Sequence, residues 1–516
     1  MNAIFTKDLT AIFNAINRSG GNPLLVGGAV RDFILGIPPK DLDVEVYNLP
    51  ADTLVSILEG FGKVDLVGKS FGVIKLTLPS GEDFDFSLPR RENKTGAGHR
   101  GFMVAADPGM TPREAAARRD FTWNALAMTP QGEIMDFFGG VSDLHIKVIR
   151  HTSEHFAEDP LRVLRGMNFA ARFDMRVADE TSELCRSLMK EAASLPRERV
   201  AAEWKKVVHK GKYPFAGLRF LQDTGWLDIF PTLRAIDGLV QDPAWHPEGD
   251  VLTHTGLALD ALVENPAWQA LPEEKKEGVW FAVLIHDLGK AVTTQTRDGR
   301  IVSPGHDAAG VELGKNLLSS ICINKDVVKL ALTLARHHMS HIGTAFKHNP
   351  GGAALKLADD LARGSPMGSI MLWAMVVEAD HGARPPLPKG SPVEEWTRLA
   401  EELGCFYGPA RPLLSGGDLI RAGMKANTPE IGKALKAVRS QQIKGILKDR
   451  TEALRWVRKA FPSQINYLTG EMLLELGIRP GREMGEILTK SMDAQDRGEI
   501  NSRADAFAWF HQALGK

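Results

Sequence analysis

The chain has 516 residues, too many for a single hydrophobic core, and this length predicts about three or four domains. Its formal net charge of −1 excludes a globally basic protein, so a nucleic-acid contact would have to come from a local basic surface. The three cysteines are widely spaced and no apolar run reaches the ~18 residues of a membrane span, which argues against a disulfide scaffold and a membrane partner. With no secretion-signal pattern at the start, we expect a cytoplasmic protein.

The first 150 residues mix strand-like and helix-like patterns. "NPLLVGGAV" (22–30) and "DLDVEVY" (41–47) indicate strands around a helix, and "FGVIKLTL" (71–78) and "DFDFSL" (83–88) follow with strand alternation. A polar, glycine-rich loop is expected at "RRENKTGAGHRGF" (90–102). We therefore predict an α/β domain, the head, over residues 1–150.

An Asp-x-Asp pair, Asp41 and Asp43, lies in the second of these strands. Side chains two apart on a strand point to one face, so the two carboxylates repel each other unless a cation lies between them. Mg²⁺ is the simplest occupant because it takes carboxylate and phosphate oxygens together. Two-metal phosphoryl chemistry needs a third carboxylate, for which Asp85 is preferred and Asp83, of the same parity, stays open. A solvated surface strand is the structural alternative.

Gly27 and Gly28 stand directly before the predicted helix. They allow the backbone to approach a phosphate closely, and the N–H groups of the following helix would face the anion. Together with the aspartates, the glycines predict a site for a metal-bound triphosphate.

A polar stripe follows in "EDPLRVLRGMNFAARF" (158–173), where Asp159, Arg162 and Arg165 recur at steps of three residues on a predicted helix. A carboxylate and a guanidinium on a rigid helix can accept from and donate to the edge of a nucleobase. Asp159 before a proline is also a good helix start, so capping is an alternative for Asp159, although it explains neither arginine.

From about residue 150 onward the helical period dominates. The segments "HPEGD" (246–250) and "RPPLPKGSP" (384–392) look like breaks between helical blocks. We predict a helical neck over residues 151–245, a further helical domain over 246–400 and a tail over 411–516.

The domain over 246–400 is rich in histidine. His286 and Asp287 directly follow the apolar run "VWFAVLI" (279–285), a position that does not suit a solvated pair. Imidazoles and carboxylates together suit a divalent transition metal, and the further candidates are His254, His306, His337 and Asp380. A histidine satisfied by a core partner is the commoner arrangement, which we expect for His209.

The tail contains an internal repeat. "LLSGGDLIRAGMK" (413–425) matches "YLTGEMLLELGIR" (467–479) at an offset of 54 residues, and further matches follow after a one-residue slip. We predict a duplicated helical unit with copies near 411–460 and 461–516. The first copy holds 12 Lys/Arg against 4 Asp/Glu and the second 6 against 8, so the first could contact phosphates. RNA binding, formation of a homodimer and packing alone stay open as roles of the tail.

Four motifs in order, "GGAVRD…DLD", "RRDFTWNALA", "EDPLRVLR" and "PRERVAAEW", occur over residues 20–230. Together they resemble the motif set of bacterial tRNA nucleotidyltransferases (the CCA-adding enzymes) and poly(A) polymerases, class II of the polymerase beta superfamily. The resemblance implies catalytic, Mg²⁺-binding aspartates at Asp41 and Asp43, completed by Asp85. It also implies a nucleotide pocket made of Gly27, Gly28, Arg31, Asp32, Arg118, Arg119, Asp120, Asn124, Asp159, Arg162 and Arg165.

In that resemblance, Asp159 and Arg162 hydrogen-bond the base of ATP or CTP, so that protein acts as the template. Trp123 departs from the isoleucine often found in the family, and we expect it to change the shape of the pocket.

The order H…HD…D resembles the HD phosphohydrolase domain, which occurs in many bacterial relatives of this family. The resemblance implies metal ligands at His254, His286, Asp287 and Asp380, with Lys290, His306 and His337 near a phosphate or a second metal. The HD domains of the family are associated with phosphatase and 2′,3′-cyclic phosphodiesterase activity.

We therefore expect a Mg²⁺-dependent enzyme that adds CCA, or part of it, to the 3′ end of tRNA from CTP and ATP, with a second, metal-dependent phosphohydrolase activity. The alternatives are a poly(A) polymerase, an HD phosphohydrolase with an inert head, and an RNA-binding scaffold with neither activity. The basic first copy of the tail and "RERVAAEWKKVVHKGK" (197–212) would serve RNA binding under each of them.

Overall fold

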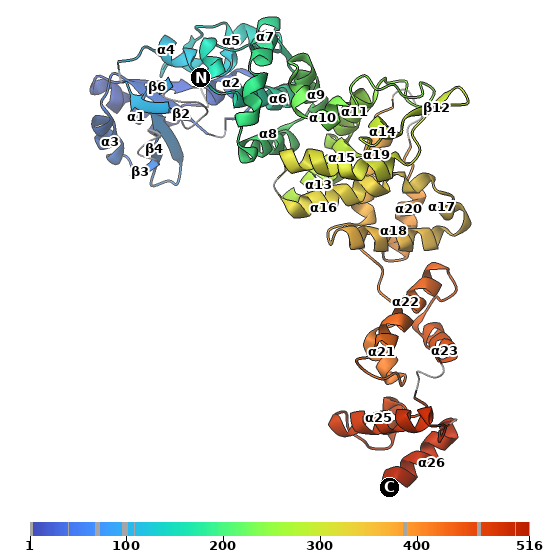
Figure 1. Ribbon diagram of the computed structural model, residues 1–516. Coiled ribbons are helices and arrows are strands. Elements are labelled where there is room, and N and C mark those ends of the chain that lie inside the picture. The colour runs from blue at the N-terminus through green and yellow to red at the C-terminus, as the bar shows by residue number, and fades with distance from the viewer. Residues whose placement is uncertain are drawn as a thin grey trace. The chain divides into compact units, whose positions relative to one another are not determined.

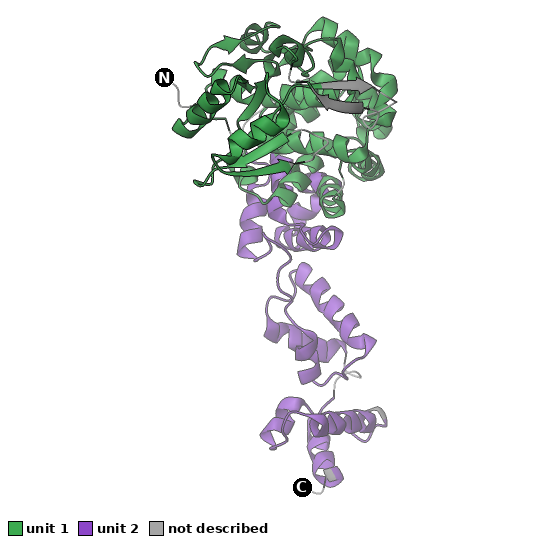
Figure 2. Ribbon diagram, turned by 90° about the vertical axis from the view of Figure 1, so that its left-hand side faces the viewer, with its two compact units in different colours: residues 1–335, 379–389 green, residues 336–378, 390–516 purple. Residues whose placement is uncertain are grey.

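The computed structural model describes residues 4–39, 41–67, 73–94, 102–107, 109–322, 324–384, 390–461, 466–500 and 502–514. The chain (Figure 1) divides into two compact units, Met1–Ala335 with Ala379–Lys389, and Arg336–Glu378 with Gly390–Lys516 (Figure 2). The β-sheets lie in the first unit, and the described part of the second is helical. Across the described ranges, no helix is long and apolar enough to cross a membrane.

A seven-stranded sheet forms the head, in the order β3-β4-β5-β2-β1-β8-β9 (Figure 1). The neighbours β2 and β5 are parallel and all other neighbouring strands are antiparallel. The strands are β1 (Asn22–Val26), β2 (Asp43–Tyr47), β3 (Lys63–Val67), β4 (Val73–Thr77), β5 (Asp83–Ser87), β8 (Ala127–Met128) and β9 (Ile134–Met135). The predicted α/β head is therefore confirmed, with a mixed sheet.

Alternation along the strands separates the core of the head from its polar face. In β5, Phe84 and Phe86 are fully buried, whereas Asp83 and Asp85 point to the opposite face. Helices complete the head, namely α1 (Lys7–Arg18), α2 (Gly28–Ile34), α3 (Ala51–Glu59), α4 (Pro112–Ala117), the 3₁₀ turn η1 (Thr122–Asn124) and α5 (Gly140–His145).

The loop expected at residues 90–102 is in part a hairpin. β6 (Arg90–Lys94) pairs antiparallel with β7 (Phe102–Ala106), while residues 95–101 lie outside the described residues. The polar sequence hides this ladder, because backbone hydrogen bonds between two strands do not require an alternating apolar face.

The neck is helical apart from a two-residue parallel pair, β10 (Val148–Ile149) with β11 (Arg176–Val177). Helix α6 (Leu161–Phe173) packs against α8 (Arg197–Lys210) and α9 (Pro214–Asp223). The remaining elements are η2 (Glu154–Glu158), α7 (Asp179–Ser187), η3 (Met189–Ser194), η4 (Trp226–Ile229) and α10 (Pro231–Arg234).

Helix α13 (Glu273–Ile285) is the centre of the next helical block, because every residue from Val279 to Ile285 is buried. It contacts α8, α11 (Val251–Val263) and α15 (His306–Ile321). The other elements here are α12 (Pro266–Gln269), α14 (Lys290–Thr293) and the hairpin of β12 (Gln295–Arg297) and β13 (Arg300–Val302). Two further helices, α16 (Lys325–His337) and α19 (Ile370–Gly382), each have residues in both compact units.

The second unit continues with η5 (His338–Ile342), α17 (Thr344–His348), α18 (Pro350–Gly364) and α20 (Glu394–Glu402). Its C-terminal part has two separate hydrophobic cores. The first core belongs to α21 (Gly416–Arg421), α22 (Pro429–Ile443) and α23 (Arg450–Ala460), and the second to α24 (Gly470–Glu475), α25 (Arg482–Asp496) and α26 (Arg503–Leu514).

The contact between α6 and α9 depends on a glycine. A Cβ at Gly166 would overlap the buried ring of Phe220. We expect Gly166→Ala to lower the free energy of unfolding by about 1–3 kcal/mol, because the core has no room for the added methyl group. Urea denaturation followed by tryptophan fluorescence measures this change.

Gly432 provides the matched control, since a Cβ there meets no atom within 4 Å. Because Gly432 lies inside helix α22, Gly432→Ala should stabilise by about 0.5–1 kcal/mol. A Gly166→Ala protein as stable as the wild type would contradict the tight packing.

Candidate functional site

Three carboxylates gather where β2 begins. Asp43 is the first residue of β2 and lies opposite Asp85 in the register of the β2–β5 pair. Asp41 precedes the strand in a bend, whereas the sequence predicted both aspartates on the strand. Burial raises the pKa of Asp43, Arg119 opposes this, and the charges of Asp85 and Asp41 raise the pKa further. Mutual repulsion of this kind is relieved by a bound divalent cation.

The register also separates the two candidates for the third carboxylate. Asp83 accepts a hydrogen bond from Thr77 Oγ1 at 2.6 Å and pairs with Lys75 Nζ at 2.8 Å. The hydrogen bond from Lys75 lowers the pKa of Asp83. Asp85 therefore lies beside Asp43, whereas Asp83, the first residue of β5, is paired with Lys75.

The chain turns at Gly27 just before α2. Gly27 has φ of 69°, a left-handed conformation that favours glycine. A Cβ at this position would lie 2.6 Å from Arg119 Nη1, so glycine allows the guanidinium to approach the turn.

Arg31, on α2, is buried in a polar and aromatic environment. It donates to Asn124 Oδ1 at 2.8 Å and to Asp32 Oδ1 at 2.6 and 2.7 Å. Burial lowers the pKa of Arg31, although the Asp32 carboxylate acts in the opposite direction. The guanidinium lies 5.1–5.8 Å from the ring centroids of Phe173, Phe169 and Trp123. Trp123 is buried in the core and packs near the Arg31 guanidinium.

Asp120 connects the end of the head to α6. Its Oδ2 accepts hydrogen bonds from the Arg165 guanidinium at 2.6 and 2.8 Å, and its Oδ1 accepts from Asn124 Nδ2 at 3.0 Å. Burial alone would raise the pKa of Asp120, but Arg165 and the bond from Asn124 lower it. The charged carboxylate thus holds α6 in place.

Asp159 and Arg162 are both fixed by neighbours at the start of α6. Asp159 accepts from Arg199 Nη2 at 2.7 Å and from the backbone N–H of Leu161, the first residue of α6, at 3.1 Å. The N-cap is Pro160, so Asp159 lies one residue before the position that the capping alternative expected. Arg162 donates to the backbone carbonyls of His155, at 2.6 Å, and Arg118, at 2.8 Å. Neither side chain is free to rotate without losing these bonds.

A cavity of about 670 Å³, here called the head cavity, brings most of the predicted site together. Its lining includes the predicted residues Gly27, Gly28, Arg31, Asp43, Arg119, Asp120, Asn124, Asp159, Arg162 and Arg165. As the described residues define it, the lining leaves out Asp41, Asp85, Asp32 and Arg118. Asp32 and Arg118 instead contact lining residues through the bonds given above.

Helix α8 adds polar lining residues that were not among the predicted site residues. They are Arg199, Glu203 and Lys206. Glu203 is buried and accepts from Lys206 Nζ at 2.7 Å and from Asn168 Nδ2 at 3.2 Å. Their spacing of four and three residues puts them on one helix face, which was a readable signal.

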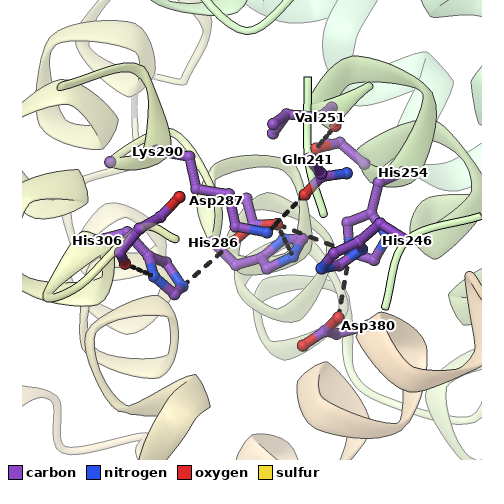
Figure 3. A network of polar contacts seen from close by, with 12 residues as sticks. Gln241, His246, Val251, His254, His286, Asp287, Lys290, His306 and Asp380 are labelled. Carbon is purple, nitrogen blue, oxygen red and sulfur yellow. Dashed lines mark hydrogen bonds and ion pairs between the residues drawn. The ribbon is translucent and has the colours of Figure 1, made fainter. Parts of the chain in front are cut away.

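A second site, here called the histidine cluster, consists of His254, His286, Asp287, His306 and Asp380 (Figure 3). His254 Nε2 is 3.1 Å from Asp380 Oδ1 and 3.7 Å from Asp287 Oδ2. His286 Nε2 is 3.2 Å from Asp287 Oδ2, and His306 Nε2 is 3.3 Å from Asp287 Oδ1. All five side chains are buried.

Backbone carbonyls set the protonation of two of these imidazoles. Val283 O accepts from His286 Nδ1 at 2.7 Å and Ser303 O accepts from His306 Nδ1 at 2.8 Å. Because a carbonyl can only accept, each Nδ1 carries a proton, and Nε2, the ring nitrogen that remains for a metal, faces a carboxylate. Nitrogen lone pairs and carboxylate oxygens at these distances form a donor set that could hold a divalent transition metal.

Two cations balance the buried carboxylates. Lys290 Nζ pairs with Asp287 Oδ2 at 2.7 Å, and Arg384 pairs with Asp380. Burial would raise the pKa of both aspartates, but the neighbouring imidazoles and these cations hold both pKa values well below the ordinary value. Both carboxylates are therefore anionic at neutral pH.

The sequence analysis missed two contributors to this cluster. The segment "HPEGD", predicted as a break between helical blocks, supplies His246 and Glu248. Glu248 Oε1 accepts from His254 Nδ1 at 2.7 Å and from His246 Nδ1 at 2.8 Å. A histidine and a glutamate inside a turn, close before His254, were the available signal.

Two other histidines have partners elsewhere. His209 Nε2 contacts the buried Glu277 Oε1 at 2.9 Å, in agreement with the expected core role. His337 is the last residue of α16 and belongs to the second compact unit, where its carbonyl accepts from Trp373 Nε1 at 2.8 Å.

Comparison with known families and proteins gives a consistent result. The poly(A) polymerase head domain family matches residues 24–150. The multifunctional CCA protein of Xanthomonas campestris pv. campestris is 36% identical over 423 residues, which cover 80% of this chain and 96% of the relative. That of Methylobacillus flagellatus is 39% identical over 317 residues, covering 61% of this chain and 72% of the relative.

Solved structures show the same fold. The Bacillus stearothermophilus CCA-adding enzyme in complex with CTP has a TM-score of 0.57 at 21% identity, covering 90% of this chain and 99% of that one. The Thermotoga maritima CCA-adding enzyme complexed with tRNA has a TM-score of 0.55 at 19% identity, covering 87% and 94%.

The Asp120–Arg165 pair predicts a pH-dependent loss of stability. Arg165→Met leaves the buried carboxylate without its counter-charge, and we expect the free energy of unfolding to fall by about 1–3 kcal/mol at pH 7. In the wild type, the lowered pKa of Asp120 contributes stability above about pH 4 that is lost as the pH falls through the folded pKa. In the variant, burial raises this pKa above its unfolded value, so the deficit should shrink from pH 7 to pH 4.

Denaturation at several pH values measures the deficit, with Arg165→Lys as the control that keeps the charge. A deficit that stays constant between pH 4 and pH 7 would show that Asp120 is not its source.

Proposed function

Because this chain belongs to the multifunctional CCA protein family, we propose that it is a template-independent nucleotidyltransferase that adds CCA, or part of it, to tRNA 3′ ends from CTP and ATP. One observation carries the proposal: the head cavity is lined both by Asp43, beside Asp85, and by the pair Asp159 and Arg162. Groups suited to reading a base and groups suited to holding a metal-bound triphosphate thus share one space.

The reading pair accounts for the choice of nucleotide. Adenine and cytosine each present an exocyclic amino group next to a ring nitrogen that accepts. Asp159 accepts from the amino group and Arg162 donates to the ring nitrogen. Uracil and guanine present a carbonyl oxygen in place of the amino group, which the Asp159 carboxylate repels.

The rest of the head cavity suits the triphosphate. Arg31, Arg119 and Arg165 supply guanidinium groups for phosphate oxygens. Asp41 and Asp43, with Asp85, would hold Mg²⁺, which lowers the pKa of the attacking hydroxyl and neutralises charge on the leaving group when bound. The RNA 3′-hydroxyl attacks the α-phosphate and pyrophosphate leaves, with much of the rate coming from positioning.

Extension of labelled tRNA transcripts ending before CCA, after C and after CC tests this function, with Mg²⁺ and with CTP and ATP singly and together. Addition of CCA followed by a stop supports the full activity, and addition of only CC or only A supports a partial enzyme. A long A-tail would instead assign a poly(A) polymerase, and no extension would contradict the nucleotidyltransferase.

The same assay identifies the third carboxylate. We expect Asp85→Asn to slow addition by about 100-fold or more, because a metal-holding carboxylate accounts for several kcal/mol of transition-state stabilisation. Asp83→Asn, on the same strand but paired with Lys75, should stay within about 2-fold. Equal losses in both variants would contradict the assignment of Asp85.

The histidine cluster favours a second function, an HD-type phosphohydrolase in the domain over residues 246–400. His254, His286, Asp287 and Asp380 would hold a divalent transition metal, which supplies a nucleophilic hydroxide at neutral pH when bound. Lys290 and His306 lie at the Asp287 carboxylate, where they could orient a phosphate. We propose the phosphorylated ends of RNA as the substrate class.

We expect Asp287→Ala to abolish hydrolysis of a 2′,3′-cyclic nucleotide in the presence of Ni²⁺ or Co²⁺, because it removes the carboxylate that faces all three imidazoles. Nucleotide addition should be unchanged. Asp43→Ala should have the converse effect, with addition lost and hydrolysis retained. Chromatography of the nucleoside monophosphate formed by ring opening and tRNA extension measure the two activities, and hydrolysis that survives Asp287→Ala would contradict this site.

We also propose that the tail, residues 411–516, is duplicated. Helices α21, α22 and α23 have 6, 15 and 11 residues, and α24, α25 and α26 have 6, 15 and 12. Glycines with positive φ recur at matching places, Gly423 with Gly477 and Gly445 with Gly498. The basic first copy is the candidate for RNA binding, and a homodimer through the second copy is the alternative role.

We further propose that residues 151–245 form a helical neck, which lies between the head and the HD domain in the sequence.

A further inference from the structure

The Glu248 carboxylate is unusual for a buried group. Its side chain is 1% exposed, and only one of its oxygens is used: Oε1 accepts from His254 Nδ1 at 2.7 Å and from His246 Nδ1 at 2.8 Å. Glu248 Oε2 is buried and has no hydrogen-bond partner among the described residues. A buried carboxylate with one unsatisfied oxygen is costly unless positive charge lies nearby.

The hydrogen bonds fix where the protons of both imidazoles lie. An ionised carboxylate can only accept, so His246 and His254 each carry a proton on Nδ1. His254 Nε2, on the other side of the ring from Glu248, lies 3.1 Å from Asp380 Oδ1 and is the nitrogen that would bind a metal. A cation held at Nε2 would balance the charge of Glu248 across the ring.

His254 differs in this respect from the two other imidazoles of the histidine cluster. His286 and His306 each donate Nδ1–H to a neutral backbone carbonyl. His254 instead donates its Nδ1–H to the Glu248 carboxylate, which increases the electron density at Nε2 and its basicity as a ligand. His246 fixes Glu248 from the other side, with its ring centroid 4.8 Å from that of His254.

We propose that Glu248 is a positioning residue of the histidine cluster, which orients His254 and increases the affinity of the cluster for a divalent transition metal, with His246 as its anchor. This inference rests on the metal site described under the proposed function. It gives the "HPEGD" turn a role in the site in place of a mere break between helices.

The test uses Co²⁺ as the probe and the full-length, metal-free protein. Co²⁺ bound by imidazole nitrogens absorbs in the visible range, and Asp287→Ala shows which part of the binding belongs to the histidine cluster. We expect Glu248→Gln to weaken this binding by about 10–100-fold, because the amide lacks the charge and can also donate to Nδ1. His246→Ala should weaken it less, since Glu248 remains.

Asp242→Asn is the matched control, because this carboxylate lies in the loop just before the turn but accepts only from the backbone N–H of Ala244, at 3.0 Å, among its bonds in the described structure. Its Co²⁺ affinity should equal that of the wild type. Retained tRNA extension shows that each variant is folded. If Glu248→Gln does not fold, Glu248→Asp, which keeps the charge but is one methylene shorter, should show the same direction of change.

The outcomes separate two failures. Suppose that the wild type binds Co²⁺ tightly and that this binding depends on Asp287. If Glu248→Gln then binds Co²⁺ equally well, the role of Glu248 is overturned and the metal site is retained. Absence of Asp287-dependent binding in the wild type would overturn the metal site, and the role of Glu248 with it. A weaker Glu248→Gln site beside an unchanged Asp242→Asn site supports the proposal.

Discussion

The hydrogen-bonded ion pair between the Arg165 guanidinium and the buried Asp120 carboxylate is the contact on which the head cavity depends. Arg165 lies on α6, and Asp120 follows α4. The other oxygen of Asp120 accepts from Asn124, whose own oxygen accepts from Arg31 on α2. One chain of bonds therefore joins the helix that carries Arg162 to the helix that follows the glycine turn.

Because the charged groups of this network are buried, each one depends on particular hydrogen-bond partners. A carboxylate removed from water is stable as an anion only when donors surround it, so Asp120 requires both Arg165 and Asn124. Arg31 likewise needs Asp32 and the aromatic rings around it. Because each member satisfies the next, the cavity is held in shape by groups that also line it. The side chains of Arg31, Arg119 and Arg162 are thereby placed in one space suited to a polyanion.

The histidine cluster differs from the head cavity in its charged groups, because carboxylates and imidazoles take the place of guanidinium groups. Two buried aspartates are balanced by Lys290 and Arg384, and their oxygens face imidazole nitrogens. The contrast between a cavity rich in guanidinium groups and a cluster rich in carboxylates and imidazoles is the physical basis for assigning two chemistries to one compact unit. The first suits phosphates and a base, and the second suits a soft-to-borderline metal.

Local sequence patterns determined the elements of this protein. Alternation placed Phe84 and Phe86 in the core and Asp83 and Asp85 on the other face, and the run ending at Ile285 indicated a central helix. What alternation cannot do is choose between two residues of one parity, because that depends on which strand lies alongside. The β2–β5 register places Asp85 opposite Asp43, and Lys75 on β4 pairs with Asp83, which is why we propose Asp85 as the third carboxylate. Likewise, the residues of α8 reach the cavity only after the helices pack, since sequence spacing carries no information on contacts between distant segments. Glu248 is close to His254 in the sequence, but its contact with His254 depends on the folded conformation of the turn between them.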